Sequence, residues 1–262
     1  MSDVHANPAA LARAVDDARS CGVEAYVCLG DIVGYGPSPD EAITLSREVF
    51  GNRVVVGNHD SALLYEMSMG SFSRRAQKSI SAQRCMVGAK NLAWLEACPD
   101  MIREGSALFV HGDVHRDGDS LKAGFGYVFR PEDVKRVISA VDGTGVNIVF
   151  VGHTHEPAMW RLGDAGGIEM VAEDRMSVEA PDRCVVNVGT VGCPRSVPFA
   201  SYAIVDATGD GAVCVELRKL PFDYSGYRAS LLAANADVPI WLEDLVSRQG
   251  ANLDIQNERV ML

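Results

Sequence analysis

Short apolar runs that end abruptly in polar loops recur four or five times along this chain, and they strongly limit the folds open to it. Ala25–Leu29 is followed by a loop rich in Gly and Pro, and Asn147–Val151 is followed by Gly152 and His153. Apolar runs of this length, bounded by turn residues, are typical of buried strands. Segments with helical apolar spacing separate several of the runs. The alternation predicts an α/β fold with two packed sheets and helices outside them.

Caps and periodicity place the individual elements. Pro8 (after the cap residue Asn7), Pro39 and Pro131 mark helix starts, because Pro suits the first helical position. The stretch Ser61–Cys98 is mainly helical by pattern. In the second half of the chain apolar residues recur with a period of two, which predicts antiparallel or mixed strands. The remaining expected strands are Arg53–Val56, Ala107–Val110, Ala158–Leu162, Gly167–Val171, Arg183–Val186, Tyr202–Val205 and Val213–Leu220, and the last expected elements are helices at Tyr224–Ala234 and Ile240–Ser247 and a loosely held tail from Gly250.

Composition narrows the compartment and the partners. The 24 Lys and Arg residues against 35 Asp and Glu give a net charge of −11, which argues against nucleic acid as a ligand. The sequence has no apolar run of about 18 residues and no secretory pattern at its start. Its seven Cys lack the paired spacing of a disulfide framework or a zinc ribbon. We therefore expect a cytoplasmic protein with no membrane partner, and its oligomeric state stays open.

The polar loops carry side chains that are common metal ligands. In open α/β sheets, ligands bind beyond the carboxyl ends of the strands, so we expect these loops to converge on one site. They bring two carboxylates, one amide oxygen and five imidazoles, a set suited to divalent metals. Eight groups exceed the needs of one tetrahedral ion, whereas two ions that share a bridging carboxylate would use them fully. The eight residues are Asp3, His5, Asp31, Asn58, His59, His111, His153 and His155.

The order of these motifs resembles the calcineurin-like metallophosphoesterase superfamily. The chain has Asp-x-His at its start, then Gly-Asp-x-x-Gly, Gly-Asn-His-Asp, a later His after a strand, and Gly-His-Thr-His. The loops Gly30–Pro37 and Asn187–Arg195 resemble its small prokaryotic phosphodiesterase-like branch. The match runs from Asp3 to about Leu220, which is most of the chain.

The resemblance implies a fold as well: a four-layer αββα sandwich of two mixed β-sheets flanked by helices. The chain would form one domain over residues 1–262, with a catalytic core at about 3–220 and a C-terminal helical extension at about 221–262. The superfamily has an apolar strand before Asp-x-His, yet only Met1 and Ser2 precede the motif here. We therefore expect the first β-strand to be truncated, with the true start of the protein upstream.

Residue by residue, the resemblance implies two metal sites. The first would use Asp3, His5, Asp31 and His155, and the second would use Asp31, Asn58, His111 and His153. An anionic bridge such as Asp31 is needed, because two dications roughly 3.5–4 Å apart repel each other strongly. Mixed nitrogen and oxygen donors of this kind accept Mn, Fe, Ni or Zn, so the identity of the metals stays open.

Other residues of these loops would face the substrate. His59 would act as the general acid, and its neighbour Asp60 would orient or charge it. Tyr35 either lines the pocket or serves ordinary loop packing. Arg195 either holds a second phosphate or nucleotide group or pairs with a surface carboxylate. A group of cations at helical spacing is expected to form a solvated face: Arg74, Arg75, Lys78 and Arg84.

These roles predict a dinuclear metal-dependent phosphoesterase acting on phosphodiesters, with monoesters and nucleotides kept open. A hydroxide that bridges the metals would attack phosphorus in line, while His59 protonates the departing alkoxide. Protein Ser/Thr phosphatases carry Arg after the bridging Asp and before Gly-Asn-His, where this chain has Gly34-Tyr35 and Val56. We therefore expect a small phosphorylated substrate. The alternative is a non-catalytic scaffold of the same fold, which the intact ligand set disfavours.

Overall fold

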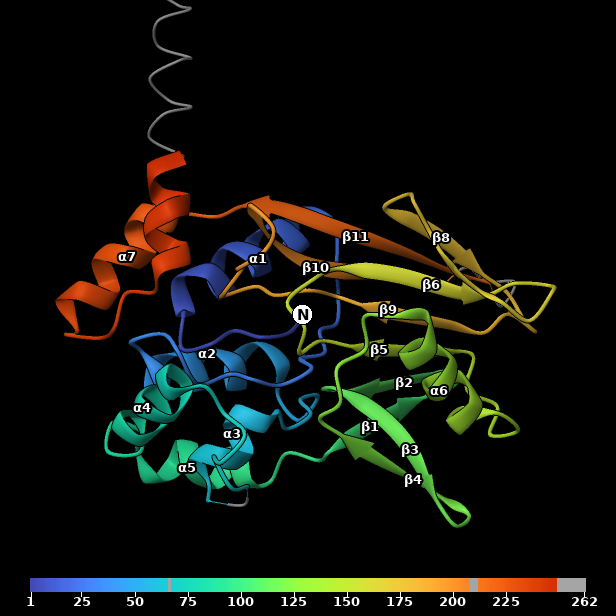
Figure 1. The fold of residues 1–262 in the computed structure, drawn as a ribbon, viewed down its shortest axis with the longest axis horizontal. Helices are drawn as coiled ribbons and strands as arrows, with labels where there is room; N and C mark the ends of the chain where they lie inside the picture. Colours follow the sequence, from blue (N-terminus) through green and yellow to red (C-terminus); the bar gives the residue numbers. More distant parts are fainter. Residues whose placement is uncertain (66, 208–211, 249–262) are drawn as a thin grey trace, which may run out of the picture.

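Two β-sheets stack face to face in the computed structural model, which describes residues 1–65, 67–207 and 212–248 (Figure 1). The larger sheet has the strand order β1-β2-β5-β9-β6-β7, in which β2, β5 and β9 are parallel and the outer pairs are antiparallel. Its strands are Met101–Glu104 (β1), Ala107–Val110 (β2), Ile148–Val151 (β5), Cys184–Asn187 (β9), Ala158–Leu162 (β6) and Ile168–Met170 (β7).

The smaller sheet packs on the larger one through apolar side chains. Its order is β10-β11-β8, with bounds Phe199–Ala207, Val213–Pro221 and Arg175–Val178. Between the sheets, Phe150 and Val186 from one side meet Val215 from the other in a buried cluster. The three strands of this sheet are antiparallel throughout, whereas the sequence predicted two mixed sheets.

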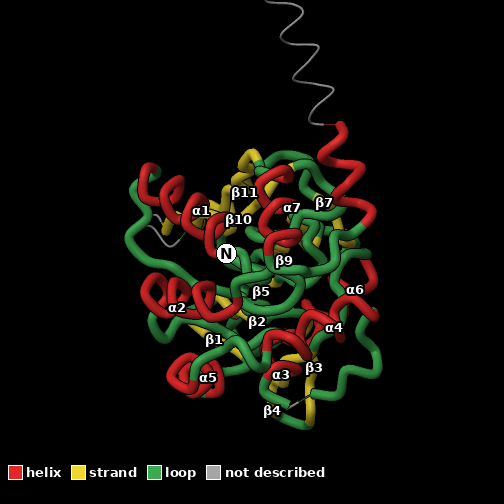
Figure 2. Tube along the Cα trace, turned by 90° about the vertical axis from the view of Figure 1, so that its left-hand side faces the viewer, coloured by secondary structure: helices red, strands yellow, loops and turns green. Residues whose placement is uncertain are grey.

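Helices cover the outer face of each sheet. Helices α1 (Pro8–Ser20) and α2 (Pro39–Phe50) pack in one apolar cluster with Tyr202 of β10, whereas α6 (Pro131–Val141) packs against the larger sheet. In Figure 2, α1 and α2 lie on one side of the molecule and α6 on the other, with the strands between them. The predicted αββα sandwich is therefore confirmed. Asn7 caps α1 by accepting a hydrogen bond from Ala10 N at 3.2 Å, as its position before Pro8 predicts.

The helical stretch predicted after residue 60 resolves into separate short helices. These are α3 (Asn58–Leu63), α4 (Arg74–Gln83) and α5 (Ala89–Glu96). Near the C-terminal end, α7 (Tyr224–Ala233) and residues 240–248 are also helical. The predicted tail from Gly250 lies outside the described residues, and the division into a core and a C-terminal extension stays a prediction. In the part of the chain that is described, no helix is both long and apolar enough to span a bilayer.

Two expected strands, Ala25–Leu29 and Arg53–Val56, are reduced to a single parallel bridge between Cys28 and Val54. The residues around Met1 pair with one edge of this segment, since Leu29 N donates to the Met1 carbonyl at 2.9 Å. Beyond Met1, a groove of about 810 Å³ separates residues 23–27 from β10. Without a strand partner across this groove among the described residues, the segment stays extended but does not form a regular ladder.

Three other differences concern strands that the sequence did not indicate. Strands β3 (Asp113–Asp117) and β4 (Ser120–Gly124) form a two-stranded hairpin, β1 pairs with β2, and β8 pairs with β11. The hairpin consists largely of exposed polar residues, so the alternation of apolar and polar residues that marks a half-buried strand is missing. Its turn contains Gly118 with a φ of 59°, and this turn geometry holds the register.

Candidate metal centre

The predicted ligand residues converge on one buried site, where the loops that follow the strands meet (Figure 1). Asp3 and His5 lie in the N-terminal segment, and Asp31 follows residues 25–29. Asn58 and His59 lie in the first turn of α3. His111 follows β2, and His153 and His155 follow β5. Each of the eight side chains belongs to a residue that is at most 7% exposed. The sequence-based prediction of their convergence therefore agrees with the structure.

Five of these residues have backbones in the left-handed region. Their φ angles are 55° for Asp3, 49° for His5, 52° for Asp31, 66° for His153 and 66° for His155. A non-glycine residue in this conformation costs about 1–2 kcal/mol and persists only where surrounding contacts hold it. The chain therefore bends sharply at the strand ends, and these bends turn the side chains into the site.

Gly57 is needed for the approach of two of these loops. A Cβ atom at this position would lie 2.2 Å from Asp31 Oδ1 and 2.3 Å from Asp31 N, well inside van der Waals contact. The backbone amide of His59, two residues further on, donates to the same Oδ1 at 2.9 Å. The Gly-Asn-His-Asp motif therefore starts with Gly because the Asp31 carboxylate lies directly against the backbone there.

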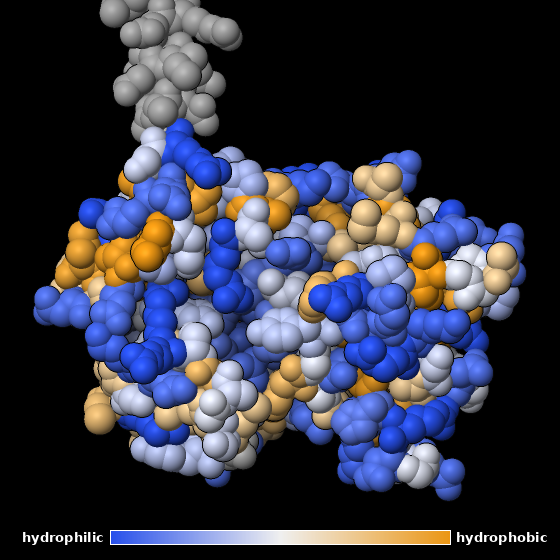
Figure 3. All heavy atoms as spheres, viewed as in Figure 1, coloured by the Kyte–Doolittle hydropathy of each residue, from blue (hydrophilic) through white to orange (hydrophobic). Residues whose placement is uncertain are grey.

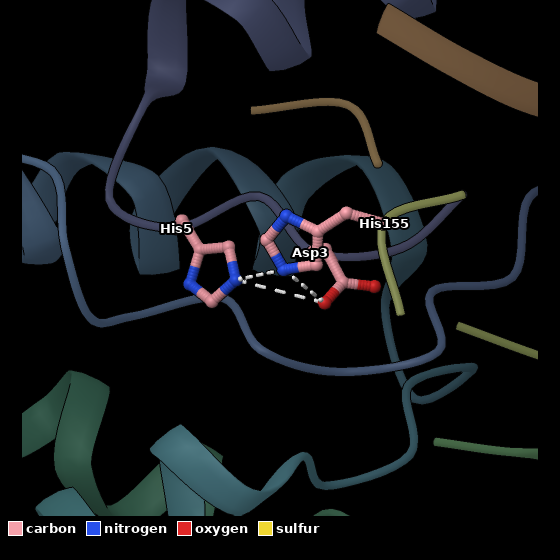
Figure 4. A group of neighbouring side chains, drawn as sticks. All are labelled: Asp3, His5 and His155. Carbon is pink, nitrogen blue, oxygen red and sulfur yellow. Dashed lines mark hydrogen bonds and ion pairs between the residues drawn. The ribbon is translucent and has the colours of Figure 1, made fainter. Parts of the chain in front are cut away.

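Asp3, His5 and His155 form the first cluster (Figure 4). His155 Nε2 lies 3.1 Å from Asp3 Oδ1, and His5 Nε2 lies 3.0 Å from His155 Nε2 and 3.6 Å from Asp3 Oδ1. The other carboxylate oxygen, Asp3 Oδ2, accepts hydrogen bonds from Ser2 Oγ at 2.5 Å and from His153 N at 3.0 Å. Asp3 Oδ1 is buried and has no hydrogen-bond donor among the described residues. Three donor atoms thus point at one another around an unsatisfied anionic oxygen, an arrangement suited to a cation.

The second cluster surrounds His111. Its Nε2 atom lies 3.4 Å from Asp31 Oδ2, 3.1 Å from Asn58 Oδ1 and 3.2 Å from His153 Nδ1. Asp31 Oδ2 also lies 3.7 Å from His5 Nε2, so the same oxygen faces both clusters. Its partner oxygen is held by the backbone of α3, which leaves Oδ2 free to serve both sides.

Backbone carbonyls orient three of the imidazole rings. The Nδ1 atoms of His5, His111 and His155 lie 3.0, 2.6 and 2.6 Å from the carbonyl oxygens of Val33, Leu29 and Cys193. A carbonyl only accepts, so each Nδ1 carries the proton and donates it. In the neutral ring Nε2 is then unprotonated and faces the site, which is the tautomer that a metal ligand requires.

The buried charges shift one another's pKa values. Burial alone would raise the carboxyl pKa values of Asp3 and Asp31, but His155 and His111 respectively hold them below the usual range. Conversely, burial lowers the pKa values of His111 and His155, but these carboxylates raise them to about 9. Both carboxylates are therefore anionic at neutral pH, and a bound metal would take the place of the imidazole protons.

His59 contacts the site through Nε2 and through its ring. Nε2 lies 3.9 Å from Asp31 Oδ2, and the ring packs edge-on against those of His5 and Phe72 at centroid distances of 4.9 and 5.2 Å. Burial lowers the pKa of His59 to about 3, and Asp31 only partly opposes this. Nδ1 of His59 is buried without a hydrogen-bond partner among the described residues, so packing alone holds the ring.

Asp60 has a different role from the expected one. Its Oδ1 accepts from Ile32 N at 2.9 Å and Val33 N at 3.2 Å, while Oδ2 accepts from Gly57 N at 3.0 Å. All of these bonds join backbone amides, and none reaches the ring of His59. Asp60 therefore ties the loop after Asp31 to the start of α3 instead of orienting the neighbouring imidazole.

The two predicted substrate residues lie at the edge of the site. The Tyr35 ring is 4.7 Å from the ring centroids of both His5 and His59, and Arg195 Cζ lies 5.5 Å from the Tyr35 centroid. Tyr127, which no sequence pattern indicated, stacks on His153 at 4.2 Å with 54% of its surface exposed. His115, the remaining histidine, is exposed on β3 away from the clusters.

The donor set fits divalent metal ions. In the described part of the chain, ligand atoms within 4.8 Å of one another form three groups: Asp3, His5 and His155; Asp31, His111 and His153; and His5, Asp31 and His59. The first two coincide with the two halves of the predicted dinuclear site. The third places His59 among possible ligands, so its assignment as general acid needs a direct test.

Comparisons with known proteins give consistent results. A family model described as the calcineurin-like phosphoesterase superfamily domain matches residues 1–210. An uncharacterized protein of Methanocaldococcus jannaschii is 30% identical over 211 residues, which cover 79% of this chain and 81% of that protein. The symmetrical bis(5'-nucleosyl)-tetraphosphatase of Neisseria gonorrhoeae is 31% identical over 97 residues, only 36% of this chain and 34% of that enzyme. The crystal structure of a metallophosphoesterase from Sphaerobacter thermophilus has a TM-score of 0.74 and 29% identity, with coverage of 94% of this chain and 96% of that one.

Proposed function

Since this chain belongs to the calcineurin-like phosphoesterase superfamily, as its motifs predicted, we propose that it hydrolyses phosphodiester bonds with two divalent metal ions. The observation that carries the proposal is the position of Asp31, whose Oδ2 atom faces both clusters of ligand atoms. One anionic oxygen shared between two sets of imidazoles is the arrangement that two neighbouring dications require. The ligand sets are Asp3, His5, Asp31 and His155, and Asp31, Asn58, His111 and His153.

Bound ions would neutralise the phosphoryl oxygens and acidify a water molecule for in-line attack. The residues of the chain supply the rest. His59 lies beside the site with Nε2 directed at it, where it can give a proton to the departing oxygen. Burial lowers the pKa of His59, but an anionic phosphoryl group next to the imidazole would favour the protonated ring and so raise this pKa again. Tyr35 and Arg195 lie where the rest of the substrate would enter.

The test combines metal content with turnover. Purified protein is analysed for bound metal and then assayed with Mn²⁺ on bis(4-nitrophenyl) phosphate and on 4-nitrophenyl phosphate. We expect about two metal ions per chain and faster hydrolysis of the diester. Faster hydrolysis of the monoester would replace the diesterase proposal with a monoesterase. Protein that binds no metal and hydrolyses neither compound would refute the enzyme proposal.

The alternative function is a non-catalytic scaffold of the same fold. A scaffold would bind metal but hydrolyse neither compound, and the same experiment distinguishes this outcome from that of an enzyme. The complete donor set and the position of His59 favour the enzyme. We also propose a small phosphorylated substrate, because the net charge of −11 disfavours nucleic acid. The cytoplasmic location, expected from the lack of a secretory pattern in the sequence, stays a proposal.

A further inference from the structure

Two arginine side chains converge on Tyr35 beside the candidate metal centre. Arg75 Cζ, from the first turn of α4, lies 4.9 Å from the centroid of the Tyr35 ring, and Arg195 Cζ, from the loop after β9, lies 5.5 Å from it. The same ring lies 4.7 Å from those of His5 and His59. Two cations from distant parts of the sequence therefore flank one ring that borders the ligand clusters.

Neither guanidinium forms an ion pair with a carboxylate in the described part of the chain; both lie near the buried thiol of Cys193. Nε and one terminal nitrogen of Arg75 are buried without a hydrogen-bond acceptor. Arg75 does lie beside Tyr227, but burial raises the pKa of that phenol, which is therefore neutral. Buried donors on a charged group are costly when unpaired, so the arrangement calls for an anionic ligand.

Two other cations of this segment have partners of their own, and Arg74 is exposed to solvent, so Arg75 differs from all three. Lys78 forms an ion pair with Asp237 at 2.7 Å, and Arg84 donates to the carbonyls of Ala62 at 2.6 Å and Leu63 at 3.3 Å. The sequence predicted one solvated face for all four cations of this segment. Arg75 departs from that prediction because it is partly buried and turned toward the ring of Tyr35.

The location suits a substrate that reaches from the metal centre to the arginines. Arg195 Cζ lies 5.5 Å from the centroid of the Tyr35 ring, and that ring lies 4.7 Å from the ring of His5, which belongs to the first cluster. Figure 3 shows hydrophilic residues lining a hollow between the side of α4 and α7 and the side of α6 and β3. A guanidinium presents a planar fork of donors that matches two phosphate oxygens at once.

We propose that Arg75 and Arg195 bind a second phosphoryl group of the substrate, next to the one that the metal centre hydrolyses. The substrate class is then compounds with at least two adjacent phosphoryl groups, such as nucleoside polyphosphates. This inference rests on the proposed phosphoesterase function and narrows it. The net charge of the chain is −11, so the positive charges of Arg75 and Arg195 would favour substrates that carry the negative charge of a second phosphoryl group.

The test uses charge-removing variants that keep the length of the side chain. Arg75→Met and Arg195→Met are compared with Arg74→Met, an exposed neighbour on the same helix, as the matched control. Each protein is assayed with Mn²⁺ on diadenosine tetraphosphate and on the 4-nitrophenyl ester of thymidine 5'-monophosphate, which has one phosphoryl group. We expect each of the two variants to raise KM roughly tenfold or more for the polyphosphate, the effect of losing charge-assisted hydrogen bonds. The control should change less than about twofold on both substrates, and the two variants should raise KM for the single-phosphate ester much less than for the polyphosphate.

A binding measurement makes the test independent of turnover. Isothermal titration of metal-free protein with inorganic pyrophosphate and with inorganic phosphate should show tighter binding of pyrophosphate, and both variants should lose this preference. Equal losses on the two substrates, or an unchanged preference in both variants, would overturn the arginine site. Absence of hydrolysis of both substrates by the unmodified protein, with the pyrophosphate preference retained, would instead refute the proposed function and leave the anion site standing.

Discussion

Gly34 lies directly against His59, and the substitution Gly34→Ala tests the role of that histidine without removing its imidazole. A Cβ atom at position 34 would lie 2.1 Å from His59 Nδ1 and 2.9 Å from its Cγ. Ordinary van der Waals contact begins near 3.4 Å, so the ring must withdraw by about 1.3 Å. Nδ1 of His59 has no hydrogen-bond partner among the described residues, so no hydrogen bond at this atom opposes the movement of the ring.

A displacement of this size is large for a proton donor. Misplacement of a catalytic group by about 1 Å can lower the rate by roughly 100-fold. The loss should be greatest for substrates with poor leaving groups, which depend most on protonation. We therefore expect Gly34→Ala to reduce kcat by about 100-fold on an alkyl phosphodiester and much less on bis(4-nitrophenyl) phosphate, while bound metal stays unchanged.

Gly22→Ala provides the matched control. Gly22 has a φ of 79°, close to the 87° of Gly34, but a Cβ atom there would meet nothing within 4 Å. Both variants therefore carry a similar backbone penalty of about 1 kcal/mol, seen as a lower melting temperature. Only Gly34→Ala should change the ratio of the two rates. If it leaves that ratio as it is in the unmodified protein, His59 is not the acid.

Three further predictions address the proposed site. His59→Ala should lower turnover most for poor leaving groups while metal analysis still finds both ions; loss of an ion would make His59 a ligand instead. Asn58→Ala should weaken one metal site only, so metal titration should show one unchanged and one weakened affinity. In metal-free protein the raised pKa values of His111 and His155 favour the folded state below about 6.5, and this stabilisation is lost as pH rises to about 9. Melting temperatures should therefore fall across that range while metal affinity rises, and a flat profile would contradict the pairing of these rings with Asp3 and Asp31.

The convergence of the candidate ligands was predictable because local sequence patterns mark their positions. Apart from Asp3 and His5 at the start of the chain, the candidate ligands closely follow apolar runs, and the strand ends of an α/β sheet meet at one edge. The sequence therefore sufficed to place His111 and His153 together although 42 positions separate them. The helix starts at Pro8, Pro39 and Pro131 were equally local, since cap and first-turn residues specify them.

Features that depend on tertiary packing were not predictable. The β3–β4 hairpin has polar exposed strands, so its register comes from a turn and not from an apolar pattern. Asp60 was assigned to its neighbour in sequence, but its Oδ1 accepts from amides of a loop 28 and 27 residues away, and its Oδ2 accepts from Gly57 N. Arg75 was placed on a solvated face because helical spacing does not show which cation is turned inward.

The groove beside Met1 also has a practical consequence. The α-amino group of Met1 is buried at the end of this groove and donates to the carbonyl of Val27 at 2.9 Å, and burial lowers its pKa. Any residues joined to this amino group turn it into a neutral amide and begin inside the groove, between residues 23–27 and the edge of β10 that has no strand partner among the described residues. A purification tag fused at this end would therefore lie in the groove. An apolar, β-branched tag should raise the melting temperature by pairing with residues 23–27 and β10 as a strand, whereas a charged tag should lower it.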